Sequence, residues 1–158
     1  MTQPIYLFDW GDTLMVDFPD QSGKMSTWEK VETVEGAEQT LQALAKEHAV
    51  YVATSAQHSS ERDIEQAFQR VGLDNYLNGY YCKANLGLEK TSVAFYHAIA
   101  QSLEVEPSHL IMVGDSLEKD IYPAQQAGLN AVLYNPNNDA VPEGITHIQS
   151  LTQLLERD

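Results

Sequence analysis

The sequence predicts an α/β fold with a mostly parallel sheet and helices on both of its faces. Three short, continuous apolar runs, at 5–8, 49–53 and 110–113, are typical of strands that are buried on both sides. Helical stripes of apolar residues lie between these runs, and strands and helices that alternate in this way form parallel sheets. The chain has 158 residues, which suits one domain with a sizeable core.

The remaining elements follow in order along the chain. An apolar stripe at 37–45 predicts the first helix, and a second stripe, at 64–71, ends at Gly72, which can cap a helix in the left-handed conformation. Thr91 or Ser92 can cap the next helix, which carries apolar residues from 95 to 103. Two weaker strands are predicted at 79–82 and 131–134. A short helix at 123–128, with Pro123 in its first turn, and a terminal helix at 151–155 complete the pattern.

The charge balance limits the partners of the protein. Acidic residues outnumber basic ones by 23 to 9, so the formal net charge is −14. Such a field repels phosphate backbones and anionic lipid surfaces, and we therefore expect neither nucleic acid nor a membrane as a partner. A site for a small anionic substrate would need a local positive charge, which a bound metal ion supplies.

The cysteine count and the first residues favour the cytoplasm. Cys82 is the only cysteine, so no internal disulfide can form, as is typical of a reducing compartment. Residues 1–10 lack the basic start and the apolar stretch of a signal peptide, and no apolar run approaches the length of a membrane span.

Polar residues gather where the predicted strands end. Ligands of an open parallel sheet bind beyond the carboxyl ends of its strands. Carboxylates that converge there repel one another unless a cation joins them, and oxygen ligands with room for water suit Mg²⁺. A metal ion and a lysine supply positive charge, and hydroxyl groups supply hydrogen-bond donors. Together they predict a phosphate-binding site at this edge of the sheet. The candidate residues are Asp9, Thr54, Ser55, Asp115, Asp120 and Lys90.

Four segments in this order resemble the motifs of the haloacid dehalogenase superfamily of hydrolases, most of which are phosphatases. They are FDWGDTL at 8–14, VATS at 52–55, Lys90, and VGDSLEKDI at 113–121. The resemblance covers nearly the whole chain and implies a three-layer Rossmann-like core. Only 45 positions separate Asp9 from Thr54, so we expect a single domain over 1–158 with a short loop insertion at about 15–35, without a large cap domain.

The resemblance also implies a role for each candidate. Asp9 would attack phosphorus and form an aspartyl phosphate, which water then hydrolyses. Thr54, Ser55 and Lys90 would hold the phosphate, and Lys90 would also neutralise the charge of Asp9. The expected cofactor is Mg²⁺ and the expected substrate is a small phosphorylated molecule. The metal would be bound by Asp9, the carbonyl of Gly11 and Asp115, with Asp120 in or beside its shell.

One position departs from the family pattern. Phosphatases of the family usually carry a second aspartate two residues after the nucleophile, as the general acid and base, and here that residue is Gly11. Asp12 is the alternative candidate for this role, although it can equally be a turn former. A good leaving group, such as that of an acyl phosphate, would make the acid unnecessary. The remaining alternative is a phosphate-binding or regulatory protein with weak or no turnover.

Several further residues have competing interpretations. Lys83 competes with Lys90 for the lysine role, but Lys90 directly precedes a helix. His58 follows Thr54 by four residues and is a candidate for proton transfer, while the other histidines have no metal-ligand spacing. Dehalogenation is disfavoured because no arginine lies near Asp9. An uncapped site is open, so self-association is one way to close it.

Overall fold

Six parallel strands form one sheet in the computed structural model, which describes residues 4–17, 27–28, 30–54, 60–82, 86–88, 90 and 92–156. The strand order is β3-β2-β1-β4-β5-β6, and every neighbouring pair is parallel. The five predicted strands are confirmed. They are β1 (Ile5–Phe8), β2 (Val50–Ala53), β3 (Gly79–Tyr81), β4 (Leu110–Gly114) and β5 (Asn130–Tyr134).

The sixth strand, β6 (His147–Ile148), was not predicted from the sequence. Two residues are too few to show an alternating or continuous apolar pattern. The strand exists because its backbone pairs with β5, so that Leu133 lies opposite His147 and Tyr134 opposite Ile148.

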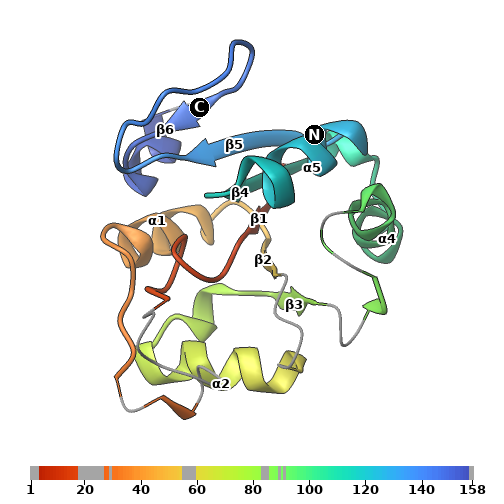
Figure 1. Cartoon of the computed structure of the whole chain (residues 1–158). Helices are drawn as coiled ribbons and strands as arrows, with labels where there is room; N and C mark the ends of the chain where they lie inside the picture. The colour runs from red at the N-terminus through yellow and green to blue at the C-terminus, as the bar shows by residue number, and fades with distance from the viewer. Residues whose placement is uncertain are drawn as a thin grey trace.

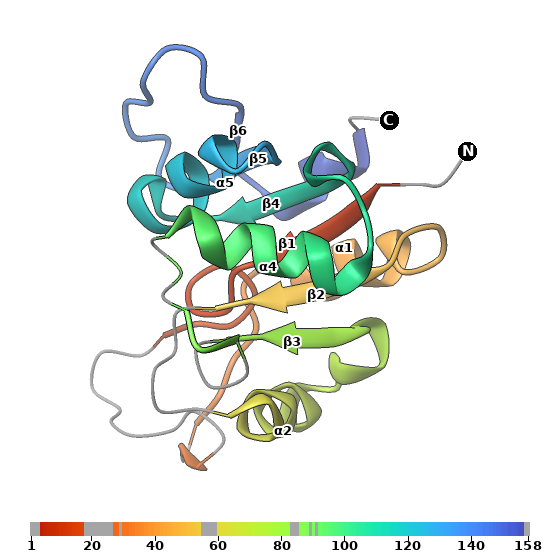
Figure 2. The ribbon, with the colours of Figure 1, turned by 90° about the vertical axis from the view of Figure 1, so that its right-hand side faces the viewer.

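The helices cover both faces of the sheet, as Figures 1 and 2 show. They are α1 (Ala37–Leu44), α2 (Glu61–Val71), α4 (Val93–Leu103) and α5 (Tyr122–Gln126). Ser92, one of the two predicted caps, caps α4, because its side chain accepts a hydrogen bond from the backbone of Phe95. Thr91, the other, lies outside the described residues. None of the helices in the described part of the chain combines the length and apolar character needed to cross a bilayer.

Alternation along β1 divides the core into two layers. Tyr6 and Phe8 join the cluster under α1 and α2, whereas Leu7 joins the cluster under α4 and α5. All three side chains are almost fully buried. Burial of one large apolar side chain contributes about 1.5–3 kcal/mol, so both layers anchor the central strand. The structure thereby has the predicted three-layer α/β fold.

Two predicted helices differ from their expected form. The terminal segment, η5 (Leu151–Glu156), is a 3₁₀ helix. The short helix α5 follows a π-type turn, η4 (Leu117–Ile121), in which the Ser116 side chain accepts a hydrogen bond from the backbone of Lys119. Apolar spacing does not distinguish these tighter or wider turns from an α-helix over so few residues. Two further 3₁₀ turns are η2 (Asp74–Tyr76) and η3 (Pro107–His109).

The two ends of the predicted insertion at 15–35 pair with each other. Met15 pairs with Thr33 in an antiparallel bridge, and the backbone N–H of Val16 donates to the carbonyl of Glu32. Trp28 is buried in the core, and its carbonyl accepts a hydrogen bond from Arg70. Trp28 therefore pins the insertion to α2. Phe18 and Met25, two further apolar residues of the insertion, lie outside the described residues.

Candidate active site

The site begins where β1, β2 and β4 end at one edge of the sheet. Phe8 pairs with Val52 of β2 and with Val113 of β4, so the residues that follow these strands emerge side by side. Asp9 is the first residue after β1, and its backbone N–H donates to the carbonyl of Val113 at 2.9 Å. Thr54, after β2, is buried, and its backbone N–H donates to the carbonyl of Tyr81.

The Asp9 carboxylate is held by two donors. The ammonium group of Lys90 lies 2.7 Å from Oδ1, and the hydroxyl of Thr13 donates to Oδ2 at 3.2 Å. Asp9 is 9% exposed, so one side of the carboxylate still reaches solvent. These contacts orient the carboxylate and leave it open toward an approaching ligand.

Lys90 is a buried cation that lies between two carboxylates. Its ammonium group lies 2.6 Å from Oδ1 of Asp120, in addition to its contact with Asp9. Lys90 and Asp120 are 2% and 1% exposed. Burial alone would lower the pKa of Lys90, but the charges of Asp9 and Asp120 outweigh it and raise that pKa. Lys90 therefore stays positively charged.

The turn after β4 positions Asp120. Its Oδ2 accepts a hydrogen bond from the backbone N–H of Ser116 at 3.0 Å. Gly114 makes this arrangement possible, because a Cβ built at that position would overlap the Asp120 carboxyl group. The π-type turn η4 therefore directs Asp120 back over the end of its own strand.

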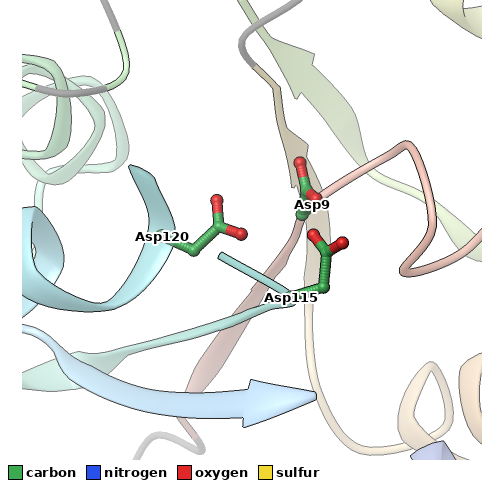
Figure 3. Close-up of side chains that lie close together, drawn as sticks. All are labelled: Asp9, Asp115 and Asp120. Carbon is green, nitrogen blue, oxygen red and sulfur yellow. The ribbon is translucent and has the colours of Figure 1, made fainter. Parts of the chain in front are cut away.

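Asp9, Asp115 and Asp120 form a cluster of carboxylates, which Figure 3 shows as side chains that point toward one another. One oxygen from each residue lies within 4.8 Å of the other two. Asp115 is itself exposed, and partial desolvation, a hydrogen bond with Asp9 and the charges of Asp9 and Asp120 raise its pKa to about 8. The pKa of Asp120 is raised to about 6 by burial and by the charge of Asp9, despite the opposing effect of Lys90.

This cluster has the chemistry of a magnesium site. All three donors are carboxylate oxygens, which are the ligands that Mg²⁺ prefers, and the exposure of Asp115 leaves room for water. A cation would relieve the mutual repulsion that raises the two pKa values. The residues present therefore fit a divalent metal ion.

The turn that follows Asp9 closes tightly on itself. The backbone N–H groups of Leu14 and Met15 both donate to the carbonyl of Trp10. Asp12 adopts a left-handed conformation, with φ of 60°, which aspartate tolerates better than most residues. Its carboxylate accepts a hydrogen bond from the backbone N–H of Asp17 at 3.0 Å. Asp12 thus has the contact of a turn former, one of the two alternatives for this residue.

Asp17 reaches the site without having been predicted as a site residue. A Cβ built on Gly11 would lie 3.4 Å from the Cβ of Asp17 and 3.5 Å from its Oδ2. Asp17 is exposed, and partial desolvation together with the charges of Asp12 and Asp9 raises its pKa. No sequence signal marks this residue, because it lies in an irregular segment and reaches Gly11 only through the closure of the turn.

A cavity of about 800 Å³ opens beside the cluster. Asp115 lines it together with residues of the turn after Asp9, the insertion and the loop after β5. Among the described residues that line it, none is a lysine, arginine or histidine. Its carboxylates are Asp12, Glu32, Glu35, Asp115 and Asp139. The wall is therefore strongly acidic.

The structure brings four of the predicted site residues together. Asp9, Lys90, Asp115 and Asp120 lie in direct contact or within one cluster. Ser55, His58 and Lys83 lie outside the described residues, so their predicted roles stay predictions.

Known proteins share sequence with this chain. Residues 6–128 match the family model described as haloacid dehalogenase-like hydrolase. The chain is 29% identical over 112 residues to ribulose-1,5-bisphosphate 5-phosphatase from Halopiger xanaduensis, covering 71% of this chain and 46% of that protein. It is 28% identical over 109 residues to pyrimidine 5′-nucleotidase PynA from Streptococcus pneumoniae, covering 68% and 45%. The chain thus spans less than half the length of these two relatives.

Solved structures share the fold over nearly the full chain. An uncharacterized protein from Listeria monocytogenes superposes with a TM-score of 0.84 at 20% identity, covering 99% of this chain and 96% of that one. A phosphatase from Thermococcus onnurineus superposes with a TM-score of 0.78 at 18% identity, covering 98% and 97%. At these identities the similarity establishes the architecture.

Proposed function

The chain belongs to the haloacid dehalogenase-like hydrolases, and from this premise we propose that it is a Mg²⁺-dependent phosphatase that forms an aspartyl phosphate on Asp9. The observation that carries the proposal is the Asp9 carboxylate, held by Lys90 and Thr13 beside two further carboxylates. The named relatives hydrolyse phosphate esters, in agreement with this reaction.

In the first step an oxygen of Asp9 attacks phosphorus, and the bond between phosphorus and the leaving oxygen breaks. Lys90 stabilises the negative charge that gathers on the phosphoryl oxygens, because its own positive charge is buried beside Asp9. Thr54 and the backbone at Ser55 would donate hydrogen bonds to the same oxygens. In the second step water attacks phosphorus, the bond to Asp9 breaks, and inorganic phosphate leaves.

Asp9, Asp115 and Asp120 would hold the Mg²⁺ ion. When bound, the ion neutralises phosphate charge and orients the phosphoryl group for attack. In a protein with a net charge of −14, this positive charge is also needed to admit an anionic substrate. We further propose that the carbonyl of Gly11 completes the protein ligands, that the chain acts as one uncapped domain, and that its substrate is a small phosphorylated molecule.

A second candidate function follows from Gly11. Without a side chain at that position, the molecule resembles a phosphate-binding protein that retains the metal site and has little turnover. The two candidates differ in phosphate release, which an efficient general acid typically accelerates by about 10²–10⁴.

The test is hydrolysis of a broad panel of phosphate esters and acyl phosphates by the full chain, with Mg²⁺ or with EDTA. Asp9→Asn is the inactive comparison, and Glu38→Gln, in the exposed first turn of α1, is a matched carboxyl-to-amide control. We expect Mg²⁺-dependent phosphate release that Asp9→Asn abolishes and Glu38→Gln preserves. After acid quenching, mass spectrometry should find a phosphoryl group on the peptide that contains Asp9.

Release no greater than that of Asp9→Asn on every compound would overturn the phosphatase proposal. In that case, calorimetric titration with inorganic phosphate in the presence of Mg²⁺ tests the second candidate directly.

A further inference from the structure

The chain folds back over Gly11 and places another carboxylate beside it. Asp17 lies six residues farther along the chain, yet its Oδ2 is 3.5 Å from the point where a Cβ of residue 11 would stand. A methyl-sized group fits at this distance, whereas a carboxylate attached to it would extend toward the space that Asp17 already fills. Residue 17 therefore occupies the region that a side chain two positions after Asp9 would enter.

We propose that Asp17 is the general acid and base of this site and supplies the carboxyl group that Gly11 lacks. The inference rests on the proposed phosphatase function. In the first step the protonated carboxyl of Asp17 would give its proton to the leaving oxygen as the phosphorus–oxygen bond breaks. In the second step the resulting carboxylate would take a proton from the attacking water, and the carboxyl group is restored with no net change.

Three features favour Asp17 over Asp12 for this role. The Asp12 carboxylate accepts a hydrogen bond from the backbone of Asp17, so it is engaged in holding the turn. Within the described part of the chain, the Asp17 carboxylate forms no such hydrogen bond. Asp17 is also exposed and lies near enough to Asp9 for their negative charges to interact.

The position also suits departure of the leaving group. Lys90 and Asp120 occupy the buried side of Asp9, so a leaving group can depart only toward the open side. Val16, which precedes Asp17 in the chain, lines the open cavity. Asp12, whose carboxylate accepts a hydrogen bond from the backbone N–H of Asp17, lines it as well. The segment that carries Asp17 therefore borders the open cavity, and the proposal places its carboxyl group on the side toward which the leaving oxygen departs.

The test is a series of phosphate esters whose leaving groups differ in basicity. p-Nitrophenyl phosphate releases a weakly basic group that needs little protonation, whereas phenyl phosphate and an alkyl phosphate release more basic groups. Asp17→Asn should lower kcat on the alkyl ester by about 10²–10⁴, and should change kcat on p-nitrophenyl phosphate much less. Because asparagine has the same shape and the backbone N–H remains, the turn is preserved. Glu38→Gln should leave all rates unchanged.

A pair of variants tests the same proposal by moving the carboxylate from position 17 to position 11. Asp17→Ala removes the carboxylate, and Gly11→Asp in that background returns one to the neighbouring position. The residue at 11 does not have a positive φ, so aspartate fits its backbone conformation. We expect the double variant to regain a substantial part of the activity that Asp17→Ala loses on basic leaving groups. Circular dichroism and thermal unfolding would establish that each variant is folded.

The outcomes separate this inference from the proposed function. Equal loss on all leaving groups in Asp17→Asn, or no loss, overturns the role of Asp17 while Asp9-dependent turnover by the wild type keeps the phosphatase proposal. A selective loss on basic leaving groups in Asp12→Asn but not in Asp17→Asn assigns the role to Asp12 and overturns the inference. No Asp9-dependent turnover by the wild type overturns both.

Discussion

The ammonium group of Lys90 lies 2.7 Å from a carboxylate oxygen of Asp9, although the two residues are 81 positions apart in the chain. The same group reaches Asp120 at 2.6 Å, so one buried cation balances two carboxylates. Removal of one partner from a buried ion pair is costly because the other charge loses its compensation. The stability of the site and its reactivity therefore depend on the same lysine.

Lys90→Met should impair both activity and folding. The substitution keeps a long side chain but leaves Asp9 and Asp120 without their cation. We expect the free energy of unfolding at neutral pH to fall by about 3 kcal/mol, the scale of a broken buried pair, and kcat to fall by at least about 10². Urea unfolding and steady-state kinetics measure the two effects.

Lys46→Met, at an exposed position after α1, is the control for loss of a lysine charge. If Lys90→Met unfolded at the same urea concentration as the wild type, the contacts of Lys90 with Asp9 and Asp120 would make no net contribution to the stability of the fold, and the prediction would be wrong.

Metal-free protein should become less stable as the pH rises. The ordinary pKa of Asp115 is 3.8, and in the fold it is raised to about 8 by partial desolvation and by its contact with Asp9. Between these values the folded protein holds protons that the unfolded chain has released, so the free energy of unfolding falls with increasing pH. Thermal unfolding in EDTA should therefore give a lower Tm at pH 8 than at pH 5.

Mg²⁺ should counteract the loss of stability at high pH, because the bound ion neutralises the carboxylates that protons neutralise at low pH. Its effect on Tm should be larger at pH 8 than at pH 5, where protons compete for the ligands. Asp115→Asn should raise the Tm of the metal-free protein at pH 8 and weaken its response to Mg²⁺. An equal Mg²⁺ response in the variant and the wild type would remove Asp115 from the metal site.

Gly114→Ala should disturb Asp120, because the new methyl group would overlap the Asp120 carboxyl group. Forcing such a group into a packed region typically costs about 1–3 kcal/mol, and we also expect weaker Mg²⁺ binding. Unfolding in urea and calorimetric titration with Mg²⁺ measure these effects.

The double variant Gly114→Ala, Asp120→Ala separates overlap from other causes. When Asp120 is already truncated, the methyl group at 114 should cost much less, so the two changes should be clearly non-additive. Additive costs would contradict the overlap as the cause.

The acidic cavity should disfavour substrates that carry a second anionic group. Its lining includes five carboxylates and, among the described residues, no basic side chain. We expect kcat/KM to be at least about tenfold higher for a monophosphate with a neutral or cationic remainder than for a matched bisphosphate, which corresponds to about 1.4 kcal/mol. Competition between glycerol phosphate and glycerol bisphosphate measures the ratio.

Replacing part of the acidic wall tests the cause of that preference. The double variant Glu32→Gln, Asp139→Asn should raise kcat/KM for the bisphosphate. The ratio of kcat/KM between the monophosphate and the bisphosphate should therefore fall. An unchanged ratio in this variant would show that the acidic wall does not select the substrate.

Local patterns were sufficient to predict five strands of the sheet and the edge that carries the candidate site. The buried apolar runs that became β1, β2 and β4 each end at a polar residue, and parallel pairing places these ends together. That reasoning identified Asp9, Thr54 and Asp115, because the position of a strand end depends mainly on nearby residues. It also identified Lys90 and Asp120, although the contact between those two was not predicted.

The contacts that complete the site depend on the tertiary structure. The pairing of Lys90 with Asp120 requires the π-type turn after β4 and the open space above Gly114, and neither has a distinct sequence pattern. Asp17 looked like the start of an irregular loop, and only closure of the turn brings it to Gly11.

The sequence alone therefore determined the order of the first five strands and of the α-helices between them, together with the residues at the main strand ends, since short-range spacing and apolar periodicity encode both. The tertiary structure decided which side chains meet across long separations, how β6 pairs, and which carboxylate fills the space beside Gly11. Such contacts depend on how the turns close and how the elements pack, which no local pattern specifies.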